Sequence, residues 1–501
     1  MTSIFQSSSD TVVAVIGGGV AGATAAVHLA EIGISTTLLE KGPGLVNGPP
    51  ICHLHAGGNL YREISDEQCF ELLRQSIDSV RLFPQTINRR PTVIAVPKRD
   101  PYSPDDLLPR LKQVQSRYRE LVDSDARNQV LGHPDDYFSV FYREDIERLK
   151  VQSQATFPES HAQWLIPFAR ETNLDELKYP VVVVEEYGWS VFRLAACAEL
   201  TLEHYSHATI KCNSELVDAE YNRGQWTLTY IDENRLQQTM TCDYLINACG
   251  YKTGTLDDMV ALPRQRMVEF KAAYVSQWDS DQAYWPEVIF HGQRGTPQGM
   301  AQLTPYADGV FQLHGMTNSI TLFNDGLAKS DACSAQPRLP SHLDQMLSDG
   351  WQSDIVAERT HKAIAYVAQF IPSYQAATSL GTPLFGAQQI PGEDADLRAA
   401  DVIFADTPYA CIEIVKGSSA LEAANKIAQH WRLSSSPIDQ NKSIETIHPY
   451  TTQLSQRAVE DLAIEIAASR GFHQGLAKVV GRDWSSKDRV PGAVNIRDGV
   501  V

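Results

Sequence analysis

One stretch near the N-terminus, residues 11–40, constrains the fold more than any other part of the chain. Residues 11–16, TVVAVI, form an apolar β-branched run that is typical of a buried strand, and residues 21–32 have the Ala and Leu content of a helix. A second predicted strand over residues 35–40, STTLLE, ends at Glu40. The stretch therefore predicts a strand, turn, helix and strand, the unit from which parallel α/β sheets are built.

The turn in this unit contains Gly17, Gly19 and Gly22, which have the spacing G-x-G-x-x-G. The first glycine permits a tight turn, the second lets the backbone approach a pyrophosphate, and the third lets the helix lie close to the strand. Glu40 stands where a carboxylate accepts hydrogen bonds from ribose hydroxyls. An acid at this position disfavours a 2′-phosphate, so the pattern predicts a site for FAD or NAD rather than NADP.

Composition limits the classes of protein that the chain can belong to. A length of 501 residues predicts about two to four domains. The net charge of −18 makes nucleic acid an unexpected partner. Glycines or charges interrupt each apolar run before it could cross a bilayer, so no integral membrane segment is expected, and residues 1–10 are interpreted as a short leader. The eight scattered cysteines predict reduced thiols in a cytoplasmic protein.

Three later segments narrow the choice of dinucleotide. Residues 208–250 alternate short strands with turns and finish on the apolar strand YLINACG. Residues 187–204 predict a turn followed by an apolar helix. Residues 409–431 predict a strand and then a helix that begins near Gly417.

Together with the N-terminal motif, these segments resemble the superfamily of FAD-dependent oxidoreductases that includes D-amino-acid oxidase, glycine oxidase and 2-hydroxyglutarate dehydrogenase. The resemblance covers the N-terminal motif and most of residues 180–431. It implies FAD as the cofactor, with the N-A-x-G turn of Asn247, Ala248 and Gly250 beside it. It also implies that the helix after Lys416 points its N-terminus at the pyrimidine end of the flavin ring. Disulfide reductases and aromatic hydroxylases fit less well, because the chain has no redox CxxxxC motif and no late Gly-Asp pair.

The implied fold class is α/β with an α+β second domain. A Rossmann-type FAD-binding domain is joined to a substrate domain built on an antiparallel sheet, with helical insertions. The expected boundaries are 1–95, 181–260 and 386–434 for three parts of the FAD-binding domain, 96–180 for a helical insertion or cap, 261–385 for the substrate domain, and 435–501 for a C-terminal helical tail.

The residues that the resemblance assigns to the cofactor come from four segments of the chain. They are Gly17, Gly19, Gly22, Glu40, Lys41, Ala56, Gly57, Gly58, Ala248, Gly250, Lys416, Gly417, Ser418 and Ser419. His55 lies in a Gly/Pro-rich loop and resembles in spacing the histidine that bonds covalently to flavin in some dimethylglycine and sarcosine dehydrogenases. Leu54 stands where those relatives carry Trp. A covalent linkage, a non-covalent contact and a solvated loop histidine all remain open for His55.

Residues 295–319 predict two strands joined by a turn, and they resemble the hairpin that carries side chains over the flavin in this superfamily. The candidates on this hairpin for lining the active site are Gln302, Thr304, Gln312 and His314. His314 and His55 are the candidate catalytic residues, since a histidine can transfer protons near neutral pH. Lys271, on a predicted strand over residues 264–278, would pair with a substrate carboxylate if it faced inward, but alternation alone does not settle its direction.

The function that follows is an FAD-dependent oxidoreductase that takes a hydride onto flavin N5 from a small amine or amino acid. Two alternatives remain open: a 2-hydroxy-acid dehydrogenase, and an FAD-binding maturation or partner subunit. Oxygen, a quinone or a carrier protein could accept the electrons, and no metal site is expected. Elsewhere, residues 103–129 and 138–170 predict helices, and the tail predicts an amphipathic helix packed on its own domain.

Overall fold

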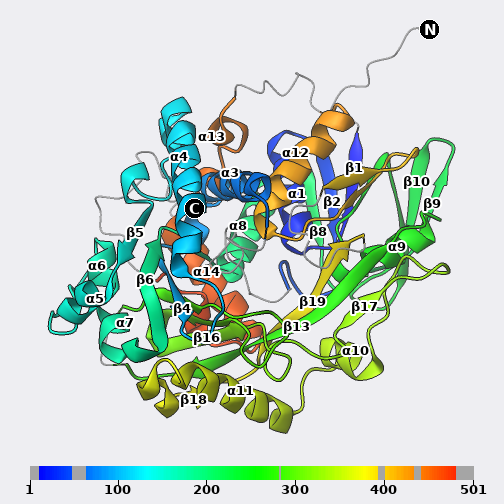
Figure 1. Cartoon of the computed structure of the whole chain (residues 1–501). Coiled ribbons are helices and arrows are strands. Elements are labelled where there is room, and N and C mark those ends of the chain that lie inside the picture. Colours follow the sequence, from blue (N-terminus) through cyan, green and yellow to red (C-terminus); the bar gives the residue numbers. More distant parts are fainter. Residues whose placement is uncertain (1–10, 48–63, 281–283, 393–400, 434–441, 481–501) are drawn as a thin grey trace.

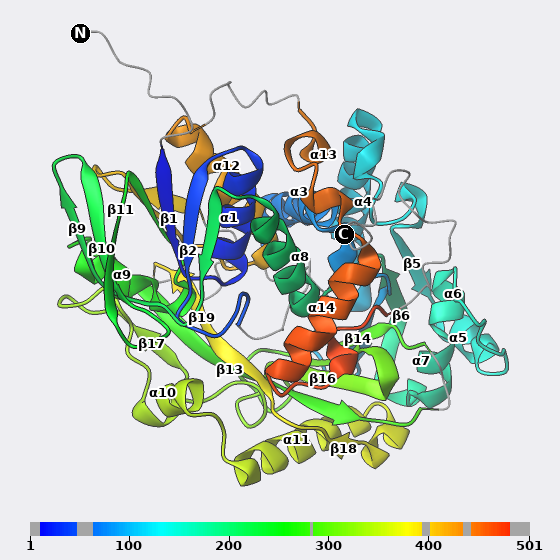
Figure 2. The ribbon, with the colours of Figure 1, turned by 180° about the vertical axis from the view of Figure 1, so that it is seen from behind.

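The computed structural model describes residues 11–47, 64–280, 284–392, 401–433 and 442–480 (Figure 1). Two sheets organise this part of the chain, and we name each after one of its strands. The β1 sheet contains the N-terminal motif, and the β13 sheet is formed mainly by residues from the middle of the chain. Figure 2, the view from behind, shows the β1 sheet and its helices packed over one side of the β13 sheet. The fold is mixed α/β, as the sequence predicts.

The β1 sheet is parallel except at one edge. Its strands, in spatial order, are β20 (Val402–Phe404), β21 (Tyr409–Ile412), β12 (Tyr244–Asn247), β1 (Val12–Ile16), β2 (Ser35–Leu39) and β8 (Ala208–Lys211). Strands β21 to β8 run parallel, and β20 pairs with β21 in the antiparallel direction. The predicted order of strand, glycine turn, helix and strand is therefore confirmed. The predicted return strand over YLINACG is β12, directly beside β1.

Both faces of the β1 sheet are covered, as expected of a parallel sheet. Val13 and Val15 pack in a cluster with three helices, α1 (Val20–Glu31), α8 (Val191–His204) and α12 (Ala420–His430). Ala14 and Ile16 point the other way, into a cluster with an antiparallel sheet of β9 (Glu215–Asn222), β10 (Gln225–Ile231) and β11 (Gln237–Cys242). This enclosure explains why residues 12–16 are almost wholly apolar.

The β13 sheet is larger and mostly antiparallel. Its strands, in spatial order, are β17 (Leu327–Lys329), β13 (Arg266–Gln277), β16 (Val310–Gly315), β15 (Ala301–Pro305), β14 (Glu287–Phe290), β4 (Thr92–Pro97), β6 (Leu177–Val184) and β5 (Phe138–Phe141), with β18 (Thr378–Ser379) and β19 (Leu384–Pro391) also paired to β13. The predicted hairpin is confirmed by the antiparallel pair β15 and β16. Tyr274 and Leu303 on one face pack in a cluster with α11 (Ser353–Ala368), and Val275 on the other face joins the core of the β1 sheet.

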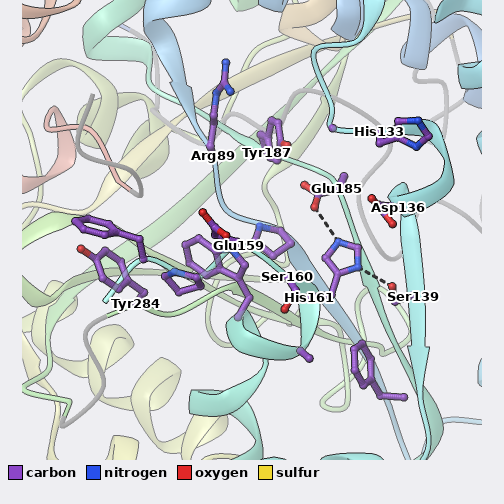
Figure 3. Close-up of a pocket in the computed structure, with 17 residues that line it drawn as sticks. Arg89, His133, Asp136, Ser139, Glu159, Ser160, His161, Glu185, Tyr187 and Tyr284 are labelled. Carbon is purple, nitrogen blue, oxygen red and sulfur yellow. Dashed lines mark hydrogen bonds and ion pairs between the residues drawn. The ribbon is translucent and has the colours of Figure 1, made fainter. Parts of the chain in front are cut away.

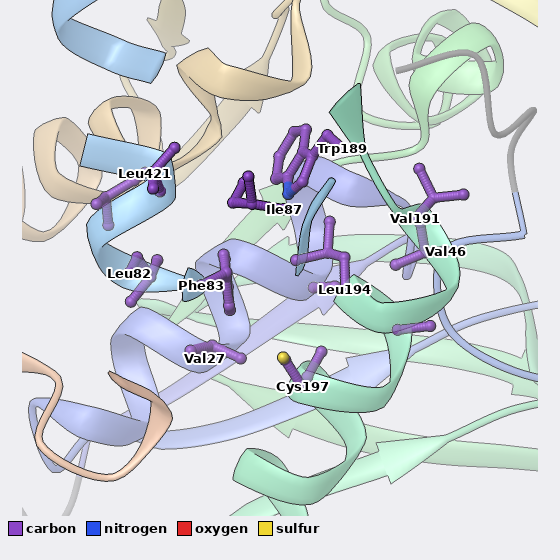
Figure 4. Close-up of a cluster of buried hydrophobic side chains, with 14 of the residues drawn as sticks. Val27, Val46, Leu82, Phe83, Ile87, Trp189, Val191, Leu194, Cys197 and Leu421 are labelled. Carbon is purple, nitrogen blue, oxygen red and sulfur yellow. The ribbon is translucent and has the colours of Figure 1, made fainter. Parts of the chain in front are cut away.

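Short elements connect the two sheets. They are α3 (Asp66–Leu82) and the small sheet of β3 (Ile87–Asn88) and β7 (Gly188–Trp189). The indole of Trp189 is 3% exposed, and its Nε1 donates to Thr86 Oγ1 at 2.7 Å. Figure 4 shows the same indole in the apolar cluster with Leu194 and Leu421. Trp189 therefore fixes β7 against the turn at Thr86 and against α8 and α12.

The chain between β4 and β6 is only partly helical. Its helices are α4 (Leu108–Ser124), α5 (Arg143–Leu149), α6 (His161–Trp164) and α7 (Ile166–Glu171). The helix predicted within 103–129 is confirmed. The helical prediction for 138–170 is wrong at its start, because residues 138–141 form β5 and pair with β6 at the edge of the β13 sheet. The domain boundaries stay predictions, and β6 spans the one expected between residues 180 and 181.

The C-terminal tail packs across both sheets. Its helices are α13 (Ile444–Ile447) and α14 (Gln456–Ser469), and α9 (Thr253–Met259) and α10 (Ser341–Ser348) lie elsewhere in the fold. Val459 and Ala463 of α14 are buried in the same cluster as α8, which confirms the predicted amphipathic helix. Further along, Lys478 Nζ forms an ion pair with Asp308 at 2.6 Å, at the turn of the β15–β16 hairpin. Among the helices that the structure describes, none combines the length and the hydropathy that crossing a membrane requires.

Two buried histidines join the tail to α1. His28 Nδ1 lies 2.9 Å from His448 Nε2, and the two residues are 0% and 1% exposed. Burial lowers the pKa of His448 to about 4. Burial, together with His448, also lowers the pKa of His28 well below its usual value. Both side chains are therefore neutral in the folded protein at neutral pH.

This pair predicts a loss of stability on acidification. An unfolded histidine takes up a proton below about pH 6.5, but the folded His448 does so only near pH 4. The unfolded state therefore binds more protons in this window, and stability falls as the pH falls from about 6.5 to about 4. The difference corresponds to about 3 kcal/mol for His448. We expect His448→Gln to show a shallower decrease of Tm over this range than the wild type.

The matched control is His361→Gln, which replaces an exposed histidine on α11. This variant should retain the wild-type pH dependence. Parallel Tm curves for His448→Gln and the wild type would contradict the assignment.

Candidate functional site

The three glycines of the N-terminal motif each have the geometry that their predicted task requires. Gly17 has φ +98°, and a Cβ there would lie 2.5 Å from the carbonyl oxygen of Ala248. A Cβ at Gly22 would lie 1.8 Å from the carbonyl oxygen of Gly17, so the missing side chain lets α1 approach the turn. A Cβ at Gly19 would meet no atom within 4 Å. The loop is thus tightly packed at its first and third glycines and open at its second, where a pyrophosphate is expected.

Glu40 lies beside this loop at the end of β2. Its Oε2 accepts a hydrogen bond from the backbone N–H of Gly18 at 2.6 Å, and its Oε1 accepts one from Gly42 at 2.6 Å. Both oxygens are therefore held by backbone donors, and the carboxylate is fixed next to the turn. The neighbouring Lys41 places Nζ 5.8 Å from the ring centre of Tyr251.

The end of β12 meets the same loop from the other side. The Asn247 amide donates to Tyr409 Oη at 2.7 Å and to the carbonyl oxygen of Thr253 at 2.9 Å. The backbone N–H of Ala248 donates to Ile16 at 2.8 Å, at the end of β1. Gly250 has φ +57°, with open space where a side chain would be. The N-A-x-G turn is thus anchored by its asparagine and open at its last glycine.

A buried cluster of charged side chains lies next to this turn. Arg266 on β13 donates to Asp257 on α9, and to Glu413 at 2.9 Å. Glu413 also accepts from Arg264 at 2.9 Å. Asp257, Cys411 and Glu413 come close enough together to suggest a cation site, but the guanidinium of Arg266 already supplies positive charge to both carboxylates. The cluster ties the β13 sheet to the ends of β12 and β21.

The loop η9 (Gly417–Ser419), which precedes α12, forms a third wall of the site. A Cβ at Gly417 would lie 2.8 Å from the ring of Trp189 and 3.3 Å from Val20, so the loop is held against β7 and the start of α1. Ser418 is 1% exposed, and its Oγ has no hydrogen-bond partner among the described residues. Lys416 stands at the N-cap of this loop. An unsatisfied buried hydroxyl is costly, so its presence here indicates room for a polar partner.

The β15–β16 hairpin brings its four predicted residues to one face. Gln302 lies opposite His314 and Thr304 lies opposite Gln312, and cross-strand partners share a face. Gln302, Thr304 and Gln312 are at most 2% exposed. Gln302 Nε2 donates to Glu287 Oε1 on β14 at 2.7 Å, so this hairpin face continues onto the next strand.

Lys271 lies on the same face, which settles the direction that alternation left open. Val275 pairs with Gln312, and Lys271 is four residues away from Val275 on β13. We use "polar face" for this surface, defined by Lys271, Gln302, Thr304, Gln312 and His314. Val275 on the same surface packs in the core of the β1 sheet, so the polar face is directed toward the cofactor loops rather than away from them.

Two hydrogen bonds connect Lys271 to the loop before α12. Lys271 Nζ donates to Gln388 Oε1 at 2.9 Å, and Gln388 Nε2 donates to the carbonyl oxygen of Val415 at 2.9 Å. Lys271 also forms an ion pair with Glu269 at 2.8 Å, and Glu269 accepts from Arg294. Burial raises the pKa of Glu269, but the charges of Lys271 and Arg294 outweigh it and lower the pKa overall. The group therefore holds two cations and one ionised carboxylate.

Sequence reasoning missed several members of this site. Glu269, Glu287 and Arg294 carry no motif. Glu269 and Glu287 lie on strands β13 and β14, and Arg294 reaches Glu269 from the chain between β14 and β15. Arg90 forms an ion pair with Glu287 at 2.6 Å, and both side chains are at most 2% exposed. A Cβ at Gly188 would lie 2.5 Å from the guanidinium of Arg90, so this pair is next to β7. Alternation gave no signal for these residues, because β14 is one acid followed by three apolar residues and Arg294 lies outside any strand.

Part of the predicted site lies outside the described residues. This part consists of His55, Ala56, Gly57 and Gly58, which belong to the segment 48–63. Ser419, in contrast, is placed: its Oγ donates to Gln75 Oε1 on α3 at 2.5 Å.

Comparisons with known proteins agree with this geometry. A family model described as FAD dependent oxidoreductase, DAO, matches residues 13–382. Glycine oxidase from Geobacillus kaustophilus has a TM-score of 0.53 and 12% identity, over 84% of this chain and 94% of that one. L-amino acid deaminase from Proteus vulgaris has a TM-score of 0.53 and 14% identity, over 88% and 97%. L-proline dehydrogenase from P. horikoshii has a TM-score of 0.51 and 14% identity, over 88% and 97%.

At these identities the solved structures show a shared fold. The search of curated proteins returned no match. The family model spans most of the chain and includes the glycine turn, the N-A-x-G turn and the β15–β16 hairpin. The chain therefore belongs to the DAO family of FAD-dependent oxidoreductases, and it is an enzyme with FAD as its cofactor.

Proposed function

We propose that the enzyme oxidises a small amine or amino acid in the space between the polar face and the loops at the ends of β1, β12 and β21. When bound, FAD accepts a hydride at N5 from the carbon that carries the amine. The observation that carries the proposal is the connection from Lys271 through Gln388 to Val415, at hydrogen bonds of 2.9 Å each. Through Gln388, the candidate substrate residue Lys271 is connected to Val415, next to the candidate flavin residue Lys416.

The residues of the cofactor loops fit FAD. The open space at Gly19 would admit the pyrophosphate, and the carboxylate of Glu40 would accept from the adenosine ribose. The buried hydroxyl of Ser418 would gain a partner at the polar edge of the ring. Lys416 would offset negative charge on the reduced pyrimidine. Whether His55 bonds to the flavin or only contacts it stays a prediction, together with the roles of Ala56, Gly57 and Gly58.

The charges on the polar face favour a substrate with a carboxylate. Lys271 and Arg294 both form ion pairs with Glu269 and bring two cationic side chains to this part of the structure. A substrate carboxylate near them would receive charge-assisted hydrogen bonds. Gln302, Thr304 and Gln312 would line the rest of the space and orient the reacting carbon. Holding that carbon about 3 to 3.5 Å from its acceptor is the main contribution the protein makes to the rate.

The two substrate classes differ in whether the protein must accept the proton that is lost from nitrogen or oxygen. An amine can lose its proton to water before oxidation, so it needs no base from the protein. A 2-hydroxy acid needs one, and His314 on the polar face would then serve. We retain 2-hydroxy-acid oxidation as the second candidate because His314 shares the face of Lys271 and Gln302.

The cellular context is also a proposal. Each cysteine within the described ranges is a free thiol, which favours the reducing cytoplasm. The electron acceptor would be oxygen, a quinone or a carrier protein.

The glycine loop provides a test of cofactor binding. Gly19→Ala adds a methyl group that touches no protein atom but enters the space assigned to the pyrophosphate. We expect this variant to keep the apoprotein's Tm and to bind FAD at least about 10-fold more weakly, as measured by fluorescence titration. Gly22→Ala is the matched comparison, because its methyl group would collide with the carbonyl of Gly17 and lower Tm. Unchanged FAD affinity in Gly19→Ala would place the pyrophosphate elsewhere.

Lys271 provides a test of substrate binding. We expect Lys271→Met to weaken binding of carboxylate substrates by about 10- to 100-fold, which is the value of one charge-assisted hydrogen bond. Anaerobic titration of the flavin absorbance with an amino acid, and with the amine that lacks its carboxylate, measures this loss. The amine should be unaffected. Lys362→Met on the exposed side of α11 is the control. Equal effects on both ligands would remove Lys271 from carboxylate binding.

His314 distinguishes amine from alcohol oxidation. Under the proposed amine chemistry, His314→Asn should change the rate of flavin reduction by no more than a few-fold, since no base is lost. With a 2-hydroxy acid as the true substrate, the same variant should slow reduction by about 10² to 10⁴. Stopped-flow reduction with the best amine and the best hydroxy acid decides between the two. A large loss with an amine would contradict the assignment of water as the proton acceptor.

A further inference from the structure

A second group of functional side chains lines a cavity of about 540 Å³ at the β5 edge of the β13 sheet (Figure 3). The cavity lies between β5, the end of β6 and the short helix α6. Its lining includes Ser139, His161 and Glu185, together with Arg89 and Tyr187. A volume of this size accommodates a small organic molecule.

The sheet register places this cavity on the opposite face from the polar face. His314 pairs with Gln302, Gln302 with Ile289, and Ile289 with Ile94. The same row continues from Ile94 to Val182 and then to Val140 on β5. Val140 therefore shares the face of His314.

Ser139, the residue before Val140, points to the other face. It pairs with Val183, which packs in the cluster beneath α11. The sheet thus separates the cavity from the space assigned to substrate oxidation.

The three side chains form a continuous hydrogen-bonded chain. His161 Nδ1 lies 2.8 Å from Ser139 Oγ, and His161 Nε2 lies 2.9 Å from Glu185 Oε1. Figure 3 shows the imidazole between the hydroxyl and the carboxylate, with a bond to each. His161 is 7% exposed and Glu185 is 19% exposed, so the histidine is nearly enclosed while the carboxylate remains at the cavity wall. This is the order of groups that activates a serine nucleophile.

Neighbouring residues hold the carboxylate in place. The backbone N–H of Glu185 donates to the carbonyl oxygen of Tyr137 at 2.8 Å, which continues the pairing of β5 with β6. Burial, followed by the charge and hydrogen bond of Glu185, raises the pKa of Tyr187. The Tyr187 phenol therefore stays protonated and donates to Glu185. With two donors on one carboxylate, the ring of His161 is fixed toward Ser139.

We propose that Ser139, His161 and Glu185 form a second catalytic centre, which hydrolyses small carboxylic esters. Ser139 Oγ bonds to the ester carbonyl carbon as its proton passes to His161 Nδ1. The bond from that carbon to the leaving alkoxy oxygen then breaks, and the alcohol departs with the proton from His161. Water repeats these steps on the acyl-serine, so that a carboxylic acid is released and Ser139 is restored. No electrons are exchanged, so this activity is independent of the flavin chemistry.

The lining defines the class of ester. Phe141, Phe157 and Trp164 present aromatic surface for an apolar or aromatic group. Arg89 belongs to the same lining. An uncharged aromatic ester such as p-nitrophenyl butyrate is therefore a suitable probe.

The test uses the purified holoenzyme with two probes, p-nitrophenyl butyrate and a fluorophosphonate. We expect the wild type to release p-nitrophenolate and to carry the fluorophosphonate on the peptide that contains Ser139. Ser139→Ala and His161→Gln should each reduce hydrolysis by about 10²-fold or more, and Ser139→Ala should abolish the label. Amine-driven flavin reduction should stay unchanged in both variants.

Ser348→Ala is the control, because Ser348 is an exposed serine on α10 and does not line the cavity. It should retain both hydrolysis and labelling. An unlabelled wild type, a label that persists in Ser139→Ala, or equal losses in Ser348→Ala would overturn the proposal. Mass spectrometry of the labelled wild type identifies the modified peptide directly. The assignment of Ser139 therefore does not depend on whether a variant folds.

Discussion

The close approach of α1 to the ends of β1 and β12 is the contact on which the arrangement of the site depends. It exists because Gly17 and Gly22 have no side chains: a Cβ at either position would lie 2.5 Å or less from a carbonyl oxygen. With α1 in this position, Val20 meets Gly417, and Gly417 in turn meets Trp189. Backbone segments from the two ends of the chain are thereby brought to one point. The start of α1, the loop before α12 and β7 thus meet at the proposed cofactor site.

The two faces of the β13 sheet carry the two proposed sites, because successive residues of a strand point to opposite faces. On one face, Lys271 and His314 lie toward the β1 sheet, on the side of the proposed flavin site. On the other face, Ser139 and Glu185 meet His161 from the inserted helices. Because a sheet is a single layer of backbone, two sites can lie close together in space and still share no solvent. The edge strand β5 shows this alternation: Ser139 lines the cavity on one face, and Val140 packs on the other face against the core of the β1 sheet.

Local pattern was sufficient to predict the β1–α1–β2 unit, the N-A-x-G strand and the β15–β16 hairpin, since each is formed by residues that are adjacent in sequence. Strand β5 was missed because its stability comes from pairing with β6, about forty residues later. The direction of Lys271 needed the register between β13 and β16, which no periodicity in one strand contains. The pairs Arg90–Glu287 and Glu269–Arg294 are likewise products of tertiary packing. The predicted loop at His55 lies outside the described residues.

The contact between the tail and the β15–β16 hairpin has a consequence for how the molecule comes apart. Lys478 reaches Asp308, and a Cβ at Gly475 would lie 2.6 Å from the carbonyl oxygen of Ala307. The same tail contacts α8 and α1, which belong to the β1 sheet. Moving the β1 sheet away from the β13 sheet would therefore break contacts that the tail makes with one of them. Such shared surface couples the stability of the two units, because separating them would expose the tail's contacts with both.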